Sequence, residues 1–167
     1  MTRALEDVAR ELGALLRRLK GLHAEVTAVA DVRLEMPALA VLTTLELQGA
    51  QRPSSLADTL DLDLSTVSRQ LSALEREGRV LRQRDADDHR AQIVELSPAG
   101  RDVLSLIRRT RVERLSARLP DWSEDELAAF AGQLARFTAD ISQPHPDCPN
   151  TPQTRPLALA AAGQEDR

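Results

Sequence analysis

Hydrophobic residues recur at heptad spacing along the first 30 residues of the chain. Leucine or valine follows at intervals of three or four residues, at Leu5, Val8, Leu12, Leu15, Leu19, Leu22, Val26 and Val29. This spacing places all of these side chains along one side of an α-helix, expected at residues 3–30 with a length of roughly 40 Å. A helix of that length needs a long partner for its apolar side. The partner lies either in the same subunit or in a second copy of the chain, and we favour a dimer interface.

Five further helices are expected after this first helix. Aromatic residues make up 2% of the chain while leucine and alanine are abundant, a composition that favours helices. Capping residues, together with proline in a first turn, mark the helix starts, and glycine or proline ends three of the helices. The helices are expected at residues 36–49, 54–60, 64–77, 98–120 and 123–141. The expected caps are Thr2, Ser54 or Ser55, Asp63, Ser97, and Ser123 in a capping box with Glu126.

The hydrophobic period changes after Gly78, where two short runs of strand-favouring residues flank a polar segment. The runs are "RVLRQR" at residues 79–84 and "QIVELS" at 92–97, and "DADDHRA" lies between them. This pattern predicts a β-hairpin with a charged tip. The expected fold class is therefore mainly α with a small β-hairpin.

The helix expected at residues 64–77 has two chemically different faces. Val67, Leu71 and Leu74 recur at helical spacing and should point into the core. The opposite face carries Ser65, Arg69, Ser72 and Arg76, flanked by Thr66, Ser68 and Gln70. Such hydroxyl, amide and guanidinium groups hydrogen-bond phosphates and base edges. With the short helix before it, this helix predicts a helix-turn-helix, whose second helix enters the DNA major groove by its N-terminal end.

Positive charge is concentrated in this region. Five arginines oppose two glutamates between Ser65 and Arg84, although the whole chain has a formal net charge of -4 and a pI near 5.4. An acidic average does not exclude a locally cationic face, because net charge governs solubility and long-range fields. The alternative is an ordinary amphipathic helix whose polar face is solvated. The hairpin favours nucleic-acid binding, because a helix-turn-helix followed by a hairpin makes a winged helix.

The hairpin tip contains Asp88 and Arg90. An arginine at this place can reach a neighbouring minor groove, where a narrow A·T-rich tract concentrates negative potential. Asp88 either supports the neighbourhood of Arg90 through a salt bridge or simply favours the turn.

Three consecutive motifs resemble the core of the MarR family of bacterial transcriptional regulators. They are "STVSRQL" from Ser65, "LEREGRV" from Leu74 and "DDHRAQIVELSPAG" from Asp87, and the similarity covers about residues 5–141. The resemblance implies a winged helix-turn-helix plus a helical dimerisation domain. It also implies that Arg90 is the minor-groove arginine of the wing. The residues that it places in or beside the major groove are Ser65, Thr66, Ser68, Arg69 and Gln70.

Two positions depart from the family pattern. Asp61 stands where glycine is frequent in the turn of a helix-turn-helix, which predicts a looser or tilted turn. His89 stands where many members have a second arginine, which removes a fixed charge from the wing and predicts weaker or pH-dependent phosphate contact.

The resemblance also implies a function. It describes a homodimer that binds a double-stranded DNA operator and regulates transcription, commonly as a repressor released by a small anionic or lipophilic effector. The alternative is a winged-helix module for protein contact without direct DNA readout. The MarR-like domain is expected at residues 1–142, with dimerisation helices at about 3–30 and 98–142 and the winged helix-turn-helix at about 36–97. The proline-rich segment 143–167 is expected to be a disordered tail.

No catalytic residue, cofactor or metal site is expected, because the chain lacks a glycine-rich phosphate loop and a cluster of catalytic side chains. His145 and Cys148 are too few for a structural zinc site. His23 is expected at the surface or an interface, with effector contact as the less favoured alternative. A single cysteine and a start unlike a signal peptide predict a soluble, cytoplasmic protein. The missing phosphate loop and catalytic clusters predict that it is not an enzyme.

Overall fold

The computed structural model describes residues 2–84 and 92–142. The predicted wing residues Asp88, His89 and Arg90 and the predicted tail at 143–167 lie outside the described residues. Within the described part the chain is mainly helical with one small antiparallel sheet, as predicted. The elements in chain order are α1 (Arg3–Val29), α2 (Met36–Gln48), α3 (Pro53–Leu60), α4 (Leu64–Arg76), β1 (Val80–Arg84), β2 (Gln92–Leu96), α5 (Pro98–Arg118) and α6 (Glu124–Ile141).

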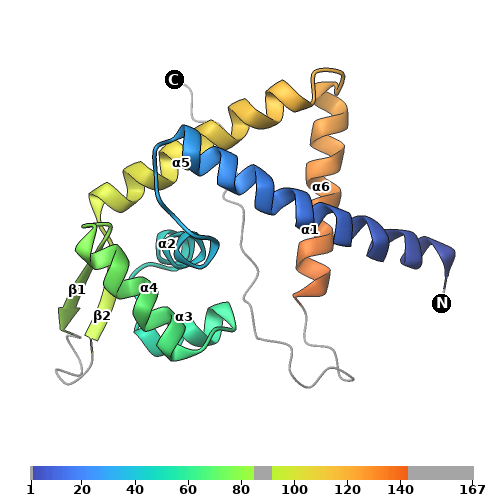
Figure 1. Cartoon of the computed structure of the whole chain (residues 1–167). Helices are drawn as coiled ribbons and strands as arrows, with labels where there is room; N and C mark the ends of the chain where they lie inside the picture. Colours follow the sequence, from blue (N-terminus) through green and yellow to red (C-terminus); the bar gives the residue numbers. More distant parts are fainter. Residues whose placement is uncertain (1, 85–91, 143–167) are drawn as a thin grey trace, which may run out of the picture.

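The elements form two groups that α5 connects. Figure 1 shows α2, α3, α4 and the β1–β2 hairpin gathered at one end of the molecule, while α1 and α6 cross at the other. The helix α5 begins at the hairpin and crosses α1. Ion pairs hold it on both sides. Arg108 on α5 donates to both carboxylate oxygens of Glu46 on α2, at 2.5 and 3.0 Å, and Arg114 and Arg118 pair with Glu25 on α1.

Two of the predicted caps make their hydrogen bonds. The Ser97 hydroxyl accepts from the backbone N–H of Gly100 at 2.9 Å, which starts α5. Ser123 and Glu126 form the predicted capping box at the start of α6. Thr2 and Asp63 occupy the N-cap positions of α1 and α4, but neither side chain makes a capping hydrogen bond.

The prediction of Ser54 or Ser55 as the cap of α3 is wrong. The helix begins at Pro53 with Arg52 in the N-cap position, so both serines lie in its first turn. Proline fits this start because its fixed φ suits a helix and its missing N–H would have no intrahelical partner there.

The turn between α3 and α4 is closed rather than loose. Asp61 adopts a left-handed conformation, with φ 51° and ψ 48°, and thus takes the role that glycine often has. Its backbone N–H and that of Leu62 both donate to the carbonyl of Ala57. Aspartate tolerates this conformation better than most residues, which explains why the departure from glycine does not open the turn.

The hairpin is antiparallel and joins the helix-turn-helix through both backbone and side chains. Val80 pairs with Leu96, Arg82 with Val94 and Arg84 with Gln92. Gln51, in the loop before α3, adds an isolated antiparallel bridge to Val94, with backbone hydrogen bonds of 2.9 and 2.8 Å. The bridge ties the middle of β2 to the loop that leads into α3, a contact that the sequence did not predict.

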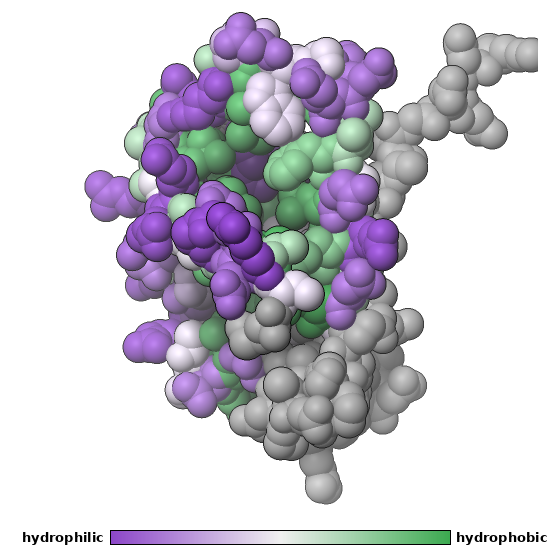
Figure 2. All heavy atoms as spheres, turned by 90° about the vertical axis from the view of Figure 1, so that its right-hand side faces the viewer, coloured by the Kyte–Doolittle hydropathy of each residue, from purple (hydrophilic) through white to green (hydrophobic). Residues whose placement is uncertain are grey.

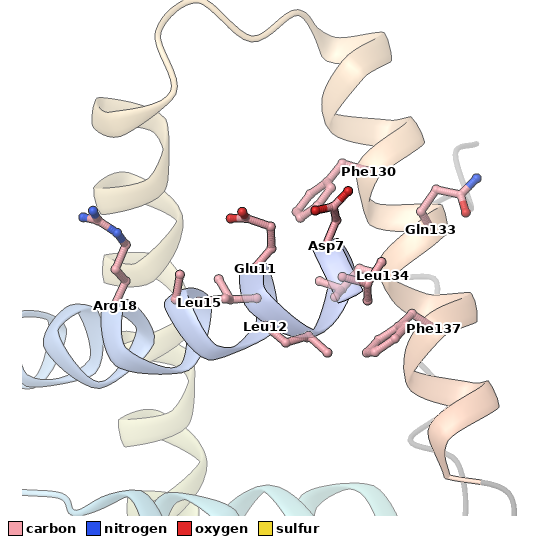
Figure 3. Close-up of a pocket in the computed structure, with 11 residues that line it drawn as sticks. Asp7, Glu11, Leu12, Leu15, Arg18, Phe130, Gln133, Leu134 and Phe137 are labelled. Carbon is pink, nitrogen blue, oxygen red and sulfur yellow. The ribbon is translucent and has the colours of Figure 1, made fainter. Parts of the chain in front are cut away.

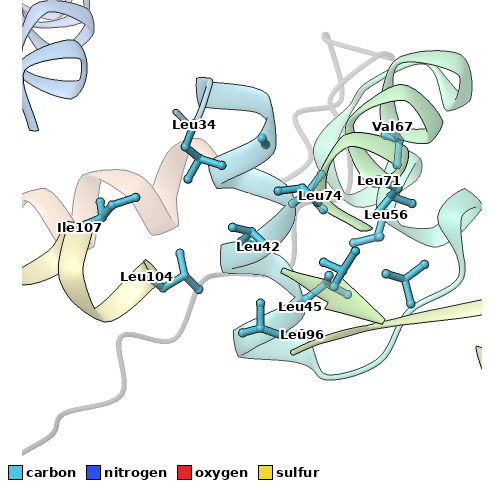
Figure 4. Close-up of a cluster of buried hydrophobic side chains, with 14 of the residues drawn as sticks. Leu34, Leu42, Leu45, Leu56, Val67, Leu71, Leu74, Leu96, Leu104 and Ile107 are labelled. Carbon is cyan, nitrogen blue, oxygen red and sulfur yellow. The ribbon is translucent and has the colours of Figure 1, made fainter. Parts of the chain in front are cut away.

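The hydrophobic core lies among α2, α3, α4, the hairpin and the first half of α5 (Figure 4). The largest fully buried side chains are Leu42, Leu56, Leu71, Leu74, Ile107, Val26, Val41, Val67, Val80 and Val94. Removing such a leucine side chain typically costs about 2–5 kcal/mol, so this core fixes the orientation of α4. Val26 is the one residue of the heptad pattern that is fully buried in the single chain.

Candidate nucleic-acid interface

The helix α4 presents a polar surface on top of a buried apolar one. Val67 and Leu71 are fully buried, which confirms the predicted inward face. On the other side Ser65, Ser68 and Arg69 are exposed, while Thr66 and Gln70 are half-buried at its flanks. The predicted residues therefore share one accessible surface at the N-terminal half of the helix. They form what we call the α4 polar face: Ser65, Thr66, Ser68, Arg69 and Gln70.

Hydrogen bonds along α4 arrange part of this face. An Arg69 guanidinium nitrogen donates to the Thr66 hydroxyl at 3.3 Å, so the arginine lies along the helix towards its N-terminus. The guanidinium has five N–H donors, and those not used by Thr66 can serve an acceptor outside the protein. The arrangement suits a base edge or a phosphate oxygen at the N-terminal half of α4.

The arginines of this region are of two kinds, which the sequence alone did not separate. Arg69 and Arg76 are exposed on α4. Arg79, by contrast, lies 3.0 Å from the Glu77 carboxylate and also donates to the carbonyl of Arg33 at 3.0 Å. Arg82 pairs with Glu75 at 2.8 Å. Glu75 and Glu77 thus each form an ion pair with one arginine. The positive charge on the outer surface is therefore smaller than the number of arginines indicates.

A cavity of about 370 Å³ lies beside α4, at the loop that joins α1 to α2. Arg33, Arg69 and Arg76 contribute positive charge to its lining, and Glu35 and Glu77 contribute negative charge. Because Arg69 and Gln70 line the cavity and also belong to the α4 polar face, the cavity adjoins that face.

His23 lies away from the α4 polar face. Its Nε2 atom is 2.9 Å from the carbonyl oxygen of Leu34, so the ring joins α1 to the loop before α2. Its Nδ1 atom is buried and has no hydrogen-bond partner among the described residues. His23 was expected at the surface or at an interface, and the structure places it half-buried within the subunit. Its contact with Leu34 could not be predicted from sequence spacing.

A second candidate surface is apolar and lies where α1 and α6 cross. Figure 3 shows Leu12, Leu15, Leu134 and Phe137 facing a shared cavity of about 590 Å³. In Figure 2 this side of the molecule shows apolar side chains between charged ones. No residue of α6 is buried in the single chain, and Phe130 is 49% exposed even though its ring makes an edge contact with Trp122. This α1–α6 apolar face lacks a cover within the described part of the chain.

Two other kinds of site are absent from the described part of the chain. No group of three or more histidine, cysteine, aspartate or glutamate side chains is placed to hold a metal ion among residues 2–84 and 92–142. In the same ranges, none of the helices is both long and apolar enough to span a membrane.

Comparison with known proteins relates this geometry to regulators. The model of a family described as the MarR family matches residues 34–91. The HTH-type transcriptional regulator YxaD of Bacillus subtilis (strain 168) is 30% identical over 133 residues, covering 80% of this chain and 92% of that protein. A second regulator from that organism, YdgJ, is 26% identical over 145 residues, covering 83% of this chain and 85% of that protein.

Solved structures share the fold. A MarR family protein from Bacillus stearothermophilus has a TM-score of 0.75 at 21% identity, with 86% of this chain and 99% of that chain covered. RV1404 from Mycobacterium tuberculosis has a TM-score of 0.73 at 20% identity, with 87% of this chain and 99% of that chain covered. The match extends beyond the helix-turn-helix to include most of the chain in each case.

Proposed function

Because the chain belongs to the MarR family of transcriptional regulators, we propose that it acts as a homodimeric repressor that a small-molecule effector releases from DNA. The chain is a DNA-binding transcriptional regulator with a winged helix, and regulators of this family bind DNA and act as dimers. The operator, the effector, the cytoplasmic location and the absence of catalytic activity are parts of the proposal.

We propose that α4 is the reading helix, the helix whose side chains contact DNA bases. The observation that supports this is that α4 carries its polar face on one side and fully buried side chains on the other. Because Val67 and Leu71 are buried in the core, α4 cannot rotate about its axis, and Arg69 stays on the exposed side. We infer that the N-terminal half of α4 enters the major groove, with Arg69 at a base edge and the hydroxyl and amide groups beside it. The inferred contacts are those of Ser65, Thr66, Ser68, Arg69 and Gln70.

Arg90 is proposed to read a flanking minor groove, with Asp88 as its support. Both residues lie outside the described part of the chain, so this rests on the sequence motif "DDHRAQIVELSPAG". The strands on either side, β1 and β2, form the hairpin that the proposal requires. A narrow minor groove attracts arginine through its concentrated negative potential.

The α1–α6 apolar face is proposed as the dimer interface. It includes Val8 and Leu15 of the heptad pattern and Phe130 and Leu134 of α6, all between 37% and 49% exposed in the single chain. Monomeric proteins rarely expose a contiguous apolar patch of this kind. A second copy related by a two-fold axis would cover both faces and place two α4 helices in successive major grooves, about 34 Å apart.

An effector of anionic or lipophilic character is proposed to bind between the dimerisation helices and the winged helix. His23 is the one residue that we name for such a contact, because it lies on α1 against the loop that leads into α2. Effector binding there would alter the separation of the two reading helices and so the affinity for DNA.

The test is a comparison of two arginine variants on a duplex that the wild-type protein selects from a randomised library. Arg69→Ala is expected to lose about 1–3 kcal/mol on the selected duplex and to relax specificity at one position. Arg90→Ala is expected to weaken binding most at A·T-rich flanks and to reduce the salt slope by about one unit at most.

A scrambled duplex and a G·C-flanked duplex serve as controls at several salt concentrations. Equal loss for Arg69→Ala on all duplexes would make Arg69 a phosphate contact and the inferred orientation of α4 wrong. An unchanged Arg90→Ala would remove the wing from DNA reading and favour a protein-contact role for the hairpin. Failure of the wild type to enrich any duplex would contradict the proposal as a whole.

A further inference from the structure

An arginine of the hairpin connects β1, β2 and the reading helix. Arg82 lies on β1, and its Nε atom is 2.8 Å from the Glu75 carboxylate on α4, an ion pair in which the Nε–H is not aligned for a hydrogen bond. One terminal nitrogen donates to the Ser72 hydroxyl on α4 at 3.4 Å, and the other donates to the Gln92 side chain on β2 at 3.3 Å. One guanidinium on β1 thus contacts two other elements, α4 and β2.

The strand pattern explains why this arginine points towards α4. Side chains alternate across a strand, so Arg82 shares a side with Val80, which is 1% exposed. Its cross-strand partner, Val94, is fully buried. Leu81, between the two, is exposed on the other side. The stem of Arg82 therefore lies at the edge of the core, and its side chain is 24% exposed.

The two α4 side chains that contact Arg82 lie on one side of that helix. Ser72 and Glu75 are three residues apart and so lie on the same side of the helix. The Ser72 hydroxyl also donates to the carbonyl of Ser68, one turn towards the α4 polar face. The chain of contacts therefore runs from the stem of the hairpin to the backbone of a residue on the α4 polar face.

We propose that Arg82 is a positioning residue, which fixes the hairpin against α4 so that the wing and the reading helix meet DNA as one rigid unit. The inference rests on the proposed function and adds to it a residue that does not touch DNA. Arg82 is suited to this role because a planar guanidinium can make several hydrogen bonds in fixed directions. Without it, the hairpin has to be ordered when DNA binds, and that ordering opposes binding.

Phosphate repulsion and hairpin positioning have opposite effects on the DNA affinity of Glu75→Ala. Removing a carboxylate near DNA strengthens binding if only charge matters, because phosphate repulsion falls. Removing it weakens binding if the ion pair with Arg82 sets the position of the hairpin. Glu77 offers a matched control, since it lies two residues further along and pairs with Arg79 instead.

The experiment uses the full chain and the duplex that the wild type selects from a randomised library. Glu75→Ala and Arg82→Ala are each expected to weaken binding by about 5- to 30-fold, from the ordering cost of roughly one backbone residue. Glu77→Ala is expected to bind as tightly as the wild type or more tightly. The double variant of Glu75 and Arg82 is expected to bind like Arg82→Ala, because both changes break the same link. Arg82→Lys is expected to fall short of the wild type, because lysine keeps the charge but not the fork.

The salt dependence separates positioning from phosphate contact. Arg82→Ala is expected to keep the wild-type slope of affinity against salt, whereas loss of a phosphate contact lowers that slope by about one unit. A lowered slope, full recovery in Arg82→Lys, or Glu75→Ala binding as tightly as Glu77→Ala would each overturn the inference. Glu75 is 45% exposed, so its substitution leaves the fold intact. The DNA affinity of Glu75→Ala therefore tests the inference even if Arg82→Ala is unstable. A wild type that selects no duplex would instead count against the proposed function.

Discussion

Replacing Phe130 with alanine is expected to weaken dimerisation strongly. Phe130 is 49% exposed in the single chain and lies on the α1–α6 apolar face. A phenylalanine side chain offers about 200 Å² for burial, so a covering partner removes roughly 100 Å² from water. At about 25 cal/mol per Å² this is worth ~2.5 kcal/mol for each subunit.

A two-fold axis repeats the contact, which doubles the loss. Since alanine retains its Cβ atom, we expect about 3–4 kcal/mol for the dimer, or about 10²- to 10³-fold in the dissociation constant. Sedimentation equilibrium over a range of protein concentrations measures this constant. Leu47→Ala is the matched control, because Leu47 is 44% exposed but lies on α2 in the winged helix.

Two results would refute the reasoning. A dissociation constant for Phe130→Ala equal to that of the wild type would place Phe130 outside the interface. An equal loss for Leu47→Ala would show that general destabilisation, and not the α1–α6 apolar face, controls assembly. Far-UV circular dichroism of both variants shows whether the helices remain folded.

Three other predictions concern the start of α5, the capping box of α6 and the segment 143–167. Gly100→Ala is expected to lower the free energy of unfolding by about 1–3 kcal/mol, because a Cβ atom there would lie 2.2 Å from the carbonyl oxygen of Arg79; an unchanged denaturation midpoint contradicts it. The backbone N–H and the hydroxyl of Ser123 lower the pKa of Glu126 below its ordinary 4.5, so the capping box stabilises α6 above that pH and this stabilisation is lost as pH falls through the lowered pKa. Ser123→Ala keeps the backbone N–H and removes the hydroxyl, so NMR titration should show the Glu126 pKa raised towards 4.5 but still below it. An unmoved pKa would disprove the contribution of the hydroxyl. Deleting residues 143–167 is expected to leave dimerisation and DNA affinity unchanged, and a loss of either would assign a role to that segment.

Local sequence rules predicted the reading helix well. The two faces of α4 follow from helical spacing, and the buried Val67 and Leu71 confirm them. The capping box of α6 and the hairpin strands also depend on neighbouring residues alone. Such features need little tertiary information, because the pattern that signals each one lies within a single helix, turn or strand run.

Contacts that form only when one element folds back on another were missed. Counting arginines could not show that Arg82 would be taken by Glu75, because that pairing requires the hairpin to fold back on α4. The contact of His23 with the Leu34 carbonyl likewise requires the loop after α1 to turn back. The start of α3 is different, since Pro53 is a local signal that outweighed the two serines after it.

The continuity of α5 has a mechanical consequence. This single helix of 21 residues is roughly 30 Å long and joins the root of the hairpin to the region where α1 lies. The ion pairs of Arg108 with Glu46 and of Arg118 with Glu25 fasten it to a helix of each group. A rigid tilt of about 6° at one end of such a helix would displace the other end by roughly 3 Å. That displacement is close to the ~3.4 Å between successive base pairs, so in the proposed dimer a small rotation at the interface would move each α4 helix by about one step along the DNA.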